Sequence, residues 1–486
     1  MEKYFRSHSF RKLLHRYEDM RDNGVSSYLE AEELTDIAEY YYSMGQKNNA
    51  MEAIDLALEI FPGTSAPLAF KARMALVYDN DPDEATRILE QINDKSDLEY
   101  IYTNAEIMFS YYSSDKVDAY LQQHLYDDFG YSENGSGNNS DENEDAEDFI
   151  LDVANLFADY EEMRLAKKWL SRSHLTDTDD YKEVLGRVLI SEGKFEESEK
   201  LFNELIDKDP YSERYWNHLA SSQFLHNKFN DSISSSEYSI AINPNDEEAI
   251  LNKANSLFSI GNYQEALIYY KKFTELQPDN EVGEMFQGIT LNYQNRPEEA
   301  LLHLQKALSI VSEESEDLSP NYQQILQEIA FVESRLGHLD NALQYMDRLE
   351  EVNPSPLNDV MRGYFYLEQG KTRQAMTCFQ GALTDSESTP EIVFHIAIAI
   401  YDHGFLNTAY KMFKSLISDA PNDWNDGYAY YARCCYERGD MEQYSDALKT
   451  AITKNPEEAR MVLSDLYPEG TEPADYPLYP LNSTLL

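Results

Sequence analysis

The stretch EEAILNKANSLFSIGNYQEALIYYKKFTELQP, residues 247–278, contains the pattern that the rest of the chain repeats. Apolar residues recur in its first half at helical spacing, as at Ala254 and Leu257, and a second helical stripe follows in its second half. Gly261 interrupts the pattern between the two halves, and Pro278 ends it. The stretch therefore predicts two helices that are joined by a tight turn.

The same pattern recurs at a fixed distance along the sequence. Pro210, Pro244 and Pro278 are each 34 residues apart, and similar apolar patterns lie between them. A fixed period of this size is the signature of a repeat array, in which each unit packs only on its neighbours. We therefore expect one long solenoid, although 486 residues would ordinarily suggest several globular domains.

These residues resemble a known family. A unit of 34 residues with small side chains at positions 8 and 20, an aromatic near 17 and proline at 32 resembles the tetratricopeptide repeat. In the central unit the corresponding residues are Ala254, Ala266, Tyr263 and Pro278. The resemblance is to uncharacterised bacterial members of the family, and it implies an all-α fold, a right-handed α-solenoid of stacked helix-turn-helix units.

The sequence divides into five segments by composition and periodicity. We predict an N-terminal amphipathic helix in residues 1–30, repeats in 31–126, an acidic loop in 127–148, the main array in 149–456, and a capping helix with an extended tail in 457–486. The acidic loop contains nine carboxylates and no basic residue, so it offers no core and is expected to be disordered. Gly24 is the expected stop of the N-terminal helix.

Charge and cysteine content narrow the functional classes. Lysine and arginine total 40 against 89 aspartates and glutamates, a net charge of -49, which disfavours binding to nucleic acid or to anionic lipid. The three cysteines, Cys378, Cys434 and Cys435, are too few for a disulfide framework and are expected to be buried. No apolar run reaches the length of about 18 residues that a membrane helix needs. A cytoplasmic protein is expected.

The sequence contains no recognisable catalytic motif, so neither an enzyme nor a bound cofactor is predicted. Phosphate-binding glycine loops, zinc-protease motifs and nucleophile elbows are all absent. Two acidic stretches, residues 79–90 and 141–145, resemble the start of a calcium loop, but Glu84 and Ala146 stand where that loop requires glycine. We interpret these stretches as a solvated turn and a disordered segment, and no metal site is predicted.

The family resemblance also implies where a ligand would bind. Positions 2, 5, 9, 12 and 13 of each first helix point away from the positions that pack between helices, and in the family they line the concave groove. Aromatic rings and amides at these positions suit the side chains and the backbone of an extended peptide. The predicted peptide-binding residues are Arg214, Asn217, Asn255, Phe258, Asn292, Tyr293, Phe331, Tyr364, Tyr401, Arg433 and Tyr436.

The sequence therefore predicts a noncatalytic scaffold that binds a neutral or basic protein or peptide segment in its groove. Capture of a chaperone tail is disfavoured, because Leu251, Val282 and Phe286 replace the basic residues that clamp a terminal carboxylate in chaperone-binding members of the family. The alternative is a regulatory or structural subunit that self-associates, or docks an enzyme, through its terminal or convex surfaces. The oligomeric state cannot be read from the sequence.

Overall fold

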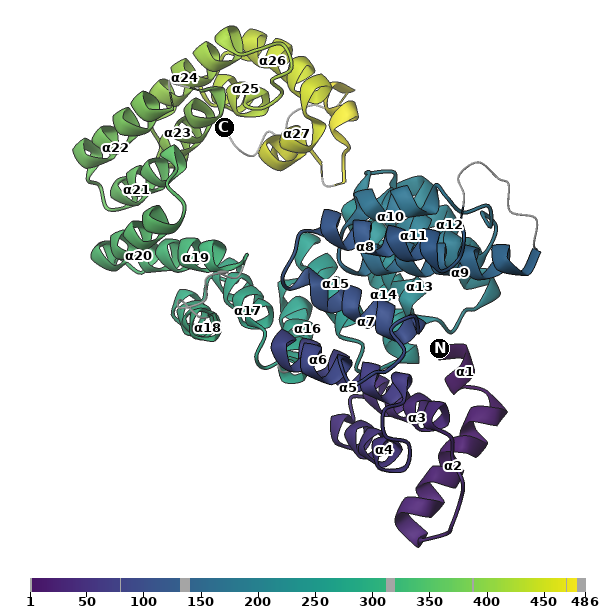
Figure 1. Cartoon of the computed structure of the whole chain (residues 1–486). Coiled ribbons are helices and arrows are strands. Elements are labelled where there is room, and N and C mark those ends of the chain that lie inside the picture. The colour runs from purple at the N-terminus through teal and green to yellow at the C-terminus, as the bar shows by residue number, and fades with distance from the viewer. Residues whose placement is uncertain are drawn as a thin grey trace. The chain divides into compact units, whose positions relative to one another are not determined.

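The computed structural model describes residues 2–78, 80–131, 140–311, 320–386, 389–468 and 470–478. All regular elements in these ranges are helices, and none is a strand (Figure 1). Successive helices are antiparallel neighbours in pairs, as the 34-residue pattern predicts. The prediction of an all-α solenoid of helix pairs is confirmed. None of the helices in the described ranges combines the length and the apolarity needed to span a membrane.

The chain forms two compact units, which we call the first unit (Met1–Ile260) and the second unit (Gly261–Leu486). The helices of the first unit are α1 (Glu2–Phe5), α2 (His8–Asn23), α3 (Ala31–Ser43), α4 (Lys47–Ile60), α5 (Ser65–Val77), α6 (Pro82–Leu89), α7 (Leu98–Phe109), α8 (Ser114–Asp127), α9 (Ser140–Asp159), α10 (Met163–Leu170), α11 (Asp179–Ser191), α12 (Phe195–Lys208), α13 (Glu213–Leu225), α14 (Phe229–Ile242) and α15 (Glu247–Ser259).

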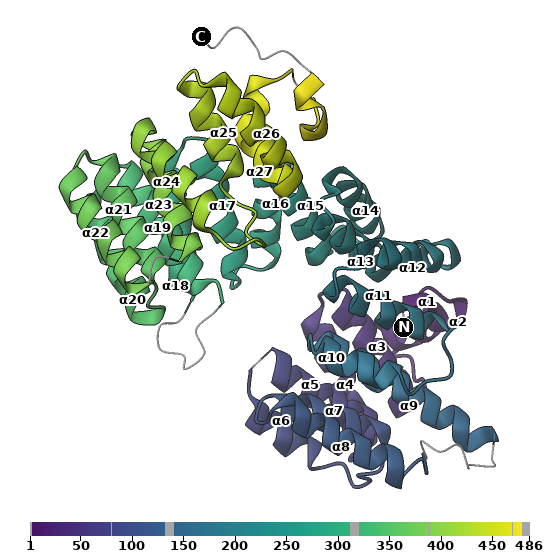
Figure 2. The same cartoon turned by 90° about the horizontal axis from the view of Figure 1, so that it is seen from above.

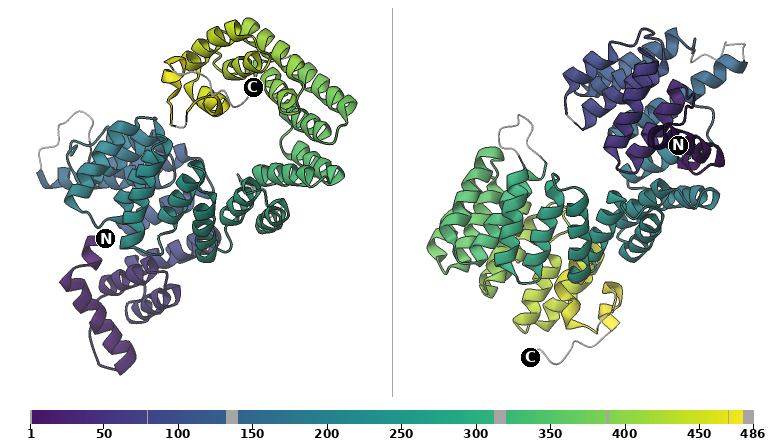
Figure 3. Two further views of the ribbon diagram at one scale, coloured as in Figure 1. Left: turned by 180° about the vertical axis from the view of Figure 1, so that it is seen from behind. Right: turned by 90° about the horizontal axis from the view of Figure 1, so that it is seen from below.

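The second unit continues the same alternation. Its helices are α16 (Tyr263–Leu276), α17 (Glu281–Tyr293), α18 (Pro297–Ile310), α19 (Tyr322–Arg335), α20 (Leu339–Val352), α21 (Pro356–Glu368), α22 (Thr372–Asp385), α23 (Pro390–Asp402), α24 (Leu406–Asp419), α25 (Tyr428–Glu437), α26 (Met441–Lys454) and α27 (Pro456–Leu463), followed by two short 3₁₀ segments, η1 (Ser464–Leu466) and η2 (Pro473–Leu478). Figures 2 and 3 show the successive helix pairs of each unit.

Each helix pair closes by packing a small residue against a large one. In the pair α11 and α12, an added Cβ on Gly186 would lie 2.7 Å from the ring of Phe202. Ala397 and Phe413, both with zero exposure, occupy the corresponding places in α23 and α24. Because the interior of a protein is as dense as an organic crystal, the large side chain requires the small one opposite. This requirement explains the small residues at position 8.

Helix α14 is the exception to this packing rule. Ser232, Ser235, Ser236 and Ser239 are all buried on this helix, whereas α12 buries one serine, Ser198, beside Phe202, Leu205 and Ile206. Three of the four hydroxyls have partners: Ser232 donates to the carbonyl of Ala220 at 2.8 Å, Ser235 to Gln223 at 2.7 Å and Ser239 to Asp246 at 2.6 Å. Hydrogen bonds thus replace much of the apolar contact in this pair.

The N-terminal helix packs its apolar stripe on the first repeat. Phe10 and Tyr17 of α2 are buried, and the ring centroids of Phe10 and Tyr40 lie 5.2 Å apart. The hydroxyl of Ser7 accepts a hydrogen bond from the amide of Phe10 and so caps the helix. Gly24 follows the last helical residue with φ of 65°, a left-handed conformation that glycine adopts without strain.

The segment at residues 127–148 is only partly a loop. Residues 132–139 lie outside the described residues, but α9 begins at Ser140, so the last nine positions of the predicted loop are helical. The reason is that Ala146 joins the apolar stripe of α9 and is 3% exposed. Glu147 is buried because its carboxylate accepts hydrogen bonds from the Ser173 hydroxyl at 2.7 Å and the His174 amide at 2.9 Å.

The C-terminal end of the array is covered by α27 and the two 3₁₀ segments. The carboxylate of Glu458 in α27 accepts hydrogen bonds from the amides of Gly427 (2.6 Å) and Ala429 (2.9 Å) at the start of α25. The tail was predicted to be extended, but η2 folds back, and the ring of Tyr476 stacks on Tyr467 with centroids 4.0 Å apart. Burial of this ring, which is 1% exposed, stabilises the folded tail.

The three cysteines are free thiols, and two of them are buried as expected. Cys434 and Cys435 are buried in α25, and Cys378 is half-buried in α22. Burial raises the pKa of the Cys434 thiol to about 12. The thiol of Cys434 is therefore protonated and unreactive at neutral pH.

Candidate ligand-binding face

The second unit is curved, and its first helices line one side of the curve. Helices α17, α19, α21, α23 and α25 lie on the inner side, and their partners α18, α20, α22, α24 and α26 lie on the outer side (Figure 1). We call the inner side of this unit the inner face. Five of the predicted peptide-binding residues lie on α17 to α23, namely Asn292, Tyr293, Phe331, Tyr364 and Tyr401.

Aromatic contacts connect successive helices of the inner face. The ring centroids of Phe331 and Tyr364 lie 5.9 Å apart, Tyr364 and His403 lie 4.7 Å apart, and Tyr401 and Tyr430 lie 5.9 Å apart. The rings meet edge to face, an arrangement that fixes their orientation. We call Phe331, Tyr364, Tyr401 and Tyr430 the aromatic row. Tyr430 was missed from the sequence because it lies at position 6 rather than at one of the groove positions considered.

Carboxylates accompany the aromatic row. The hydroxyl of Tyr401 donates a hydrogen bond to Glu437 at 2.7 Å. Burial raises the pKa of the half-buried Glu328 carboxyl, and desolvation likewise raises the pKa of the Asp402 carboxyl. Because an adjacent cation would favour the charged form of each carboxyl, the inner face is electrostatically suited to a positively charged group.

The arginines near the inner face are engaged with residues of the chain. Arg335 donates hydrogen bonds to the carbonyl of Asn292 at 3.0 Å and to the side chain of Asn295 at 2.9 Å. Arg433 pairs with Glu437 at 2.8 Å and with Asp465 at 2.5 Å. The two carboxylates neutralise Arg433, whereas Arg335 keeps its charge but has its donors occupied by neutral groups.

The C-terminal cap covers the last part of the predicted groove. Arg433 also donates to the carbonyl of Val462 in α27 at 3.4 Å, and the ring of Tyr436 lies 5.7 Å from that of Tyr444. Tyr436 is only 8% exposed. The placement of Tyr436 on an open groove is therefore corrected: it packs within the last helix pair, beneath the capping elements.

The remaining four predicted peptide-binding residues belong to the first unit. The predicted residues are therefore divided between two units and are described separately. Arg214 is exposed and pairs with the buried carboxylate of Glu183. Asn217 is 4% exposed, and its amide donates to Asp246 at 2.9 Å, which corrects its placement on an open face. Asp246 precedes α15 and reaches back to α13. Asn255 and Phe258 are half-buried on α15.

The first helices of the first unit carry an ion-pair network that sequence reasoning did not find. Arg73 of α5 lies 3.0 Å from Glu99 and 3.0 Å from Glu106. Desolvation raises the pKa of the nearby Glu39 carboxyl to about 7, although Arg73 lowers it. Glu39 and Arg73 both occupy position 9 of their repeats. The opposite charges at this position of successive repeats could have been recognised in the sequence. They indicate that position 9 is occupied by ion pairs within the chain.

Neither calcium-loop resemblance leads to a described metal site. Asp81 is the N-cap of α6, and its carboxylate accepts a hydrogen bond from the amide of Glu84 at 2.8 Å. Asp79 lies outside the described residues, as do the side chains of Asp141 and Asn143. Among the residues that the structure describes, no cluster of three His, Cys, Asp or Glu side chains is arranged to hold a metal ion.

Comparisons with known proteins agree with the repeat pattern. The tetratricopeptide-repeat family model matches residues 31–64 and 247–280. No curated protein matches the chain. Similar solved structures include a tetratricopeptide repeat protein from Parabacteroides merdae, with 16% identity, coverage of 56% of this chain and 98% of that chain, and a TM-score of 0.43.

Two further structures are similar over different lengths. The Cut9–Hcn1 hetero-tetramer of APC/C has 12% identity, coverage of 94% of this chain and 93% of that chain, and a TM-score of 0.37. PilF of Pseudomonas aeruginosa has 13% identity, coverage of 44% and 96%, and a TM-score of 0.37. At these identities and scores the likenesses carry no argument about function. The chain contains tetratricopeptide repeats at residues 31–64 and 247–280, where the family model matches.

Proposed function

We propose that this protein is a noncatalytic, cytoplasmic scaffold that holds an extended polypeptide segment with basic or neutral side chains on the inner face of the second unit. The observation that carries the proposal is the aromatic row with its carboxylates. Repeat proteins use such curved surfaces to bind other proteins. The rings supply apolar contact area at low entropic cost, because each side chain has only two rotatable bonds.

The charge of the inner face selects among peptides. Glu328 lies near Tyr293, and Asp402 lies near Tyr364 and Tyr430. Desolvation raises the pKa of both carboxyls. A lysine or arginine of the ligand would return both carboxyls toward their ordinary ionised form. A ligand carboxylate would instead meet like charge, which costs binding energy and excludes acidic segments. The ligand class is therefore a basic or neutral segment with apolar side chains.

Fluorescence anisotropy with labelled peptides tests this proposal. The probe is a 12-residue peptide of alternating lysine and leucine, and its partner is a glutamate–leucine peptide of the same length. We expect the full chain to bind the lysine peptide more tightly. Asp402→Asn and Tyr293→Ala should weaken this binding, and Tyr293 is suitable because its side chain is 62% exposed and contributes little to the core.

A matched control distinguishes binding at the inner face from nonspecific binding to exposed tyrosines elsewhere on the protein. Tyr112→Ala removes a 49% exposed tyrosine from the first unit and should leave the affinity for the lysine peptide unchanged. An unchanged affinity for the lysine peptide in Asp402→Asn and Tyr293→Ala, or equal loss in Tyr112→Ala and Tyr293→Ala, would refute the assignment of the inner face.

A terminal contact remains the second candidate function. Arg11 and Lys12 are exposed on α2 and have no ion-pair partner among the described residues, in a chain of net charge -49. This favours a subunit that associates with a second copy or with another acidic protein through α2. Light scattering of the full chain tests self-association: a dimer that dissociates in the Arg11→Glu, Lys12→Glu variant supports it, and a monomer at all concentrations contradicts it.

A further inference from the structure

The outer side of the second unit contains a basic patch between acidic neighbours. Helices α22 and α24 each carry a single acidic residue, and in both cases it is the last residue of the helix, Asp385 and Asp419. Arg373 of α22 and Lys411 and Lys414 of α24 are exposed. We call these three cations, together with Met376, the outer basic patch.

The repeat register places these side chains on one surface. Thr377 and Lys411 occupy the same position in successive repeats, as do Gln380 and Lys414, because Ala375 and Ala409 are the equivalent buried residues. Helices α22 and α24 follow one another along the outer side of the unit in all views (Figures 1 and 2). The patch therefore continues from one helix to the next.

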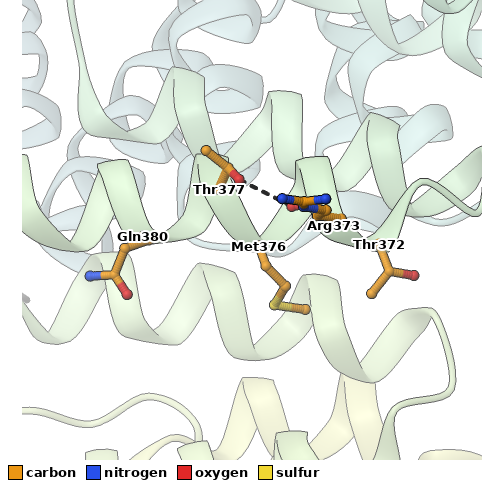
Figure 4. Close-up of a pocket in the computed structure, with 5 residues that line it drawn as sticks. All are labelled: Thr372, Arg373, Met376, Thr377 and Gln380. Carbon is orange, nitrogen blue, oxygen red and sulfur yellow. Dashed lines mark hydrogen bonds between the residues drawn. The ribbon is translucent and has the colours of Figure 1, made fainter.

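A shallow hollow lies on the surface of α22 within the patch. It is open to solvent and is lined by Thr372, Arg373, Met376, Thr377 and Gln380. Figure 4 shows that Thr372, Met376 and Gln380 point to the same side of the helix. Met376 is 39% exposed. Methionine and arginine are enriched at protein interfaces, whereas acidic residues are depleted there.

The cations of the patch lack carboxylate partners within the described part of the chain. Arg373 and Lys411 have no ion pair there, and Lys414 makes a cation–π contact with the ring of Tyr410 at 5.7 Å. By contrast, Arg362 on the neighbouring α21 contacts three carboxylates. Uncompensated positive charge is therefore concentrated on this outer surface of a strongly acidic protein.

The neighbouring helices limit the width of the patch. Asp340 is exposed on α20 and Glu442 is exposed on α26, and neither has an ion pair in the described part of the chain. Asp347 and Asp446 on the same helices pair with Arg362 and Lys449. Two adjacent helices span roughly 20 Å, and the screening length at physiological salt is about 8 Å. A membrane surface or a nucleic-acid duplex would place further anions over these flanking carboxylates. A narrow polypeptide can lie on the patch without that repulsion.

We propose that the outer basic patch binds an acidic polypeptide segment that also carries apolar side chains. Carboxylates of the segment pair with Arg373, Lys411 and Lys414, and an apolar side chain occupies the hollow beside Met376. Guanidinium groups bind carboxylates with two parallel hydrogen bonds, which gives Arg373 the most specific contact. This partner differs in charge from the ligand of the inner face, so the second unit would connect two partners of opposite charge.

Fluorescence anisotropy of the full chain with a labelled 12-residue glutamate–leucine peptide tests this proposal. The Lys411→Glu, Lys414→Glu variant and Arg373→Glu should each weaken binding by about tenfold or more, since a charge-assisted hydrogen bond contributes about 1.5–3 kcal/mol. Lys449→Glu on α26 is the control, because it makes the same type of charge change at a residue that already pairs with Asp446. It should change the affinity by less than about twofold.

Two comparisons identify the ligand class. Met376→Ser should weaken binding of the glutamate–leucine peptide but not of an all-glutamate peptide of the same length. Asp402→Asn, which alters the inner face, should leave both affinities unchanged. The proposal is overturned if the wild-type chain does not bind the glutamate–leucine peptide, if Lys449→Glu weakens binding as much as the patch variants, or if phosphatidylserine vesicles or duplex DNA bind the patch and the peptide does not.

Discussion

Ser236 and Ser232 of α14 provide a matched test of how polar groups contribute to this core. Both side chains have zero exposure and lie one helical turn apart. The Ser236 hydroxyl has no hydrogen-bond partner, whereas the Ser232 hydroxyl donates to the carbonyl of Ala220 and lies 2.9 Å from the donating hydroxyl of Ser256. We predict that Ser236→Ala stabilises the first unit and that Ser232→Ala destabilises it.

The magnitudes follow from what each substitution removes. Ser236→Ala removes a buried, unpaired hydroxyl, whose desolvation costs about 1–3 kcal/mol. Ser232→Ala removes one hydrogen bond and leaves the Ser256 hydroxyl without its acceptor, which costs about 1–2 kcal/mol. Alanine's better helix propensity raises the stability of both variants equally, so it cancels in the comparison. The free energy of local opening should differ between the variants by about 3 kcal/mol, or about a hundredfold in opening equilibrium.

Amide hydrogen exchange of the full chain is the appropriate assay, because a repeat array need not unfold in one cooperative transition. Exchange of the α13 and α14 amides should slow in Ser236→Ala and accelerate in Ser232→Ala, while the amides of α23 and α24 remain unchanged. If both substitutions shift the exchange in the same direction, the hydrogen-bond argument for this helix is wrong.

Three further predictions concern a buried acid, a close contact and a cap. The pKa of Glu39 is raised from its ordinary value of 4.5 to about 7 in the folded state, so the folded state binds the proton more tightly and this group destabilises the fold increasingly from pH 4.5 to 7. Glu39→Gln should therefore raise the free energy of unfolding at pH 7.5 by on the order of 3 kcal/mol and have no effect near pH 4, as measured by urea unfolding. Gly186→Ala should cost about 1–3 kcal/mol because its Cβ would overlap the Phe202 ring, and Phe202→Leu should recover part of the loss in thermal unfolding. Glu458→Ala should cost about 1–3 kcal/mol and accelerate exchange of the Gly427 and Ala429 amides, whose acceptor it removes, whereas Glu457→Ala should not.

The fold could be predicted from the sequence because its determinants are local and periodic. The small residue at position 8, the turn glycine and the terminating proline recur at a fixed distance, and each has a direct structural consequence, as Gly186 against Phe202 shows. The end of the acidic segment could not be predicted in this way. The buried contacts of Glu147 depend on Ser173 and His174, which lie 26 and 27 residues further along the chain, after the end of α10.

The candidate site was predictable only as a set of helix positions. The position of a residue within the 34-residue repeat indicates the direction of its Cβ. Phe331, Tyr364 and Tyr401 lie on the first helices of their pairs, as these positions predict. The position cannot show which neighbouring element reaches the side chain. The side-chain amide of Asn217 donates to Asp246, and the ring of Tyr436 packs against Tyr444 within the last helix pair. The position of a residue within the repeat predicts neither contact.

The two surfaces of the second unit follow from one property of the repeat. The buried positions fix the fold, so the remaining positions of the first and second helices can differ in charge without disturbing the core. On the inner side those positions carry tyrosines with Glu328 and Asp402, and on the outer side of α22 and α24 they carry Arg373, Lys411 and Lys414. Reversing the charge of one surface should therefore change the binding of one peptide and leave the other unaffected. If Asp402→Lys instead weakened the glutamate–leucine peptide as strongly as Lys411→Glu, the two surfaces could not act as separate sites.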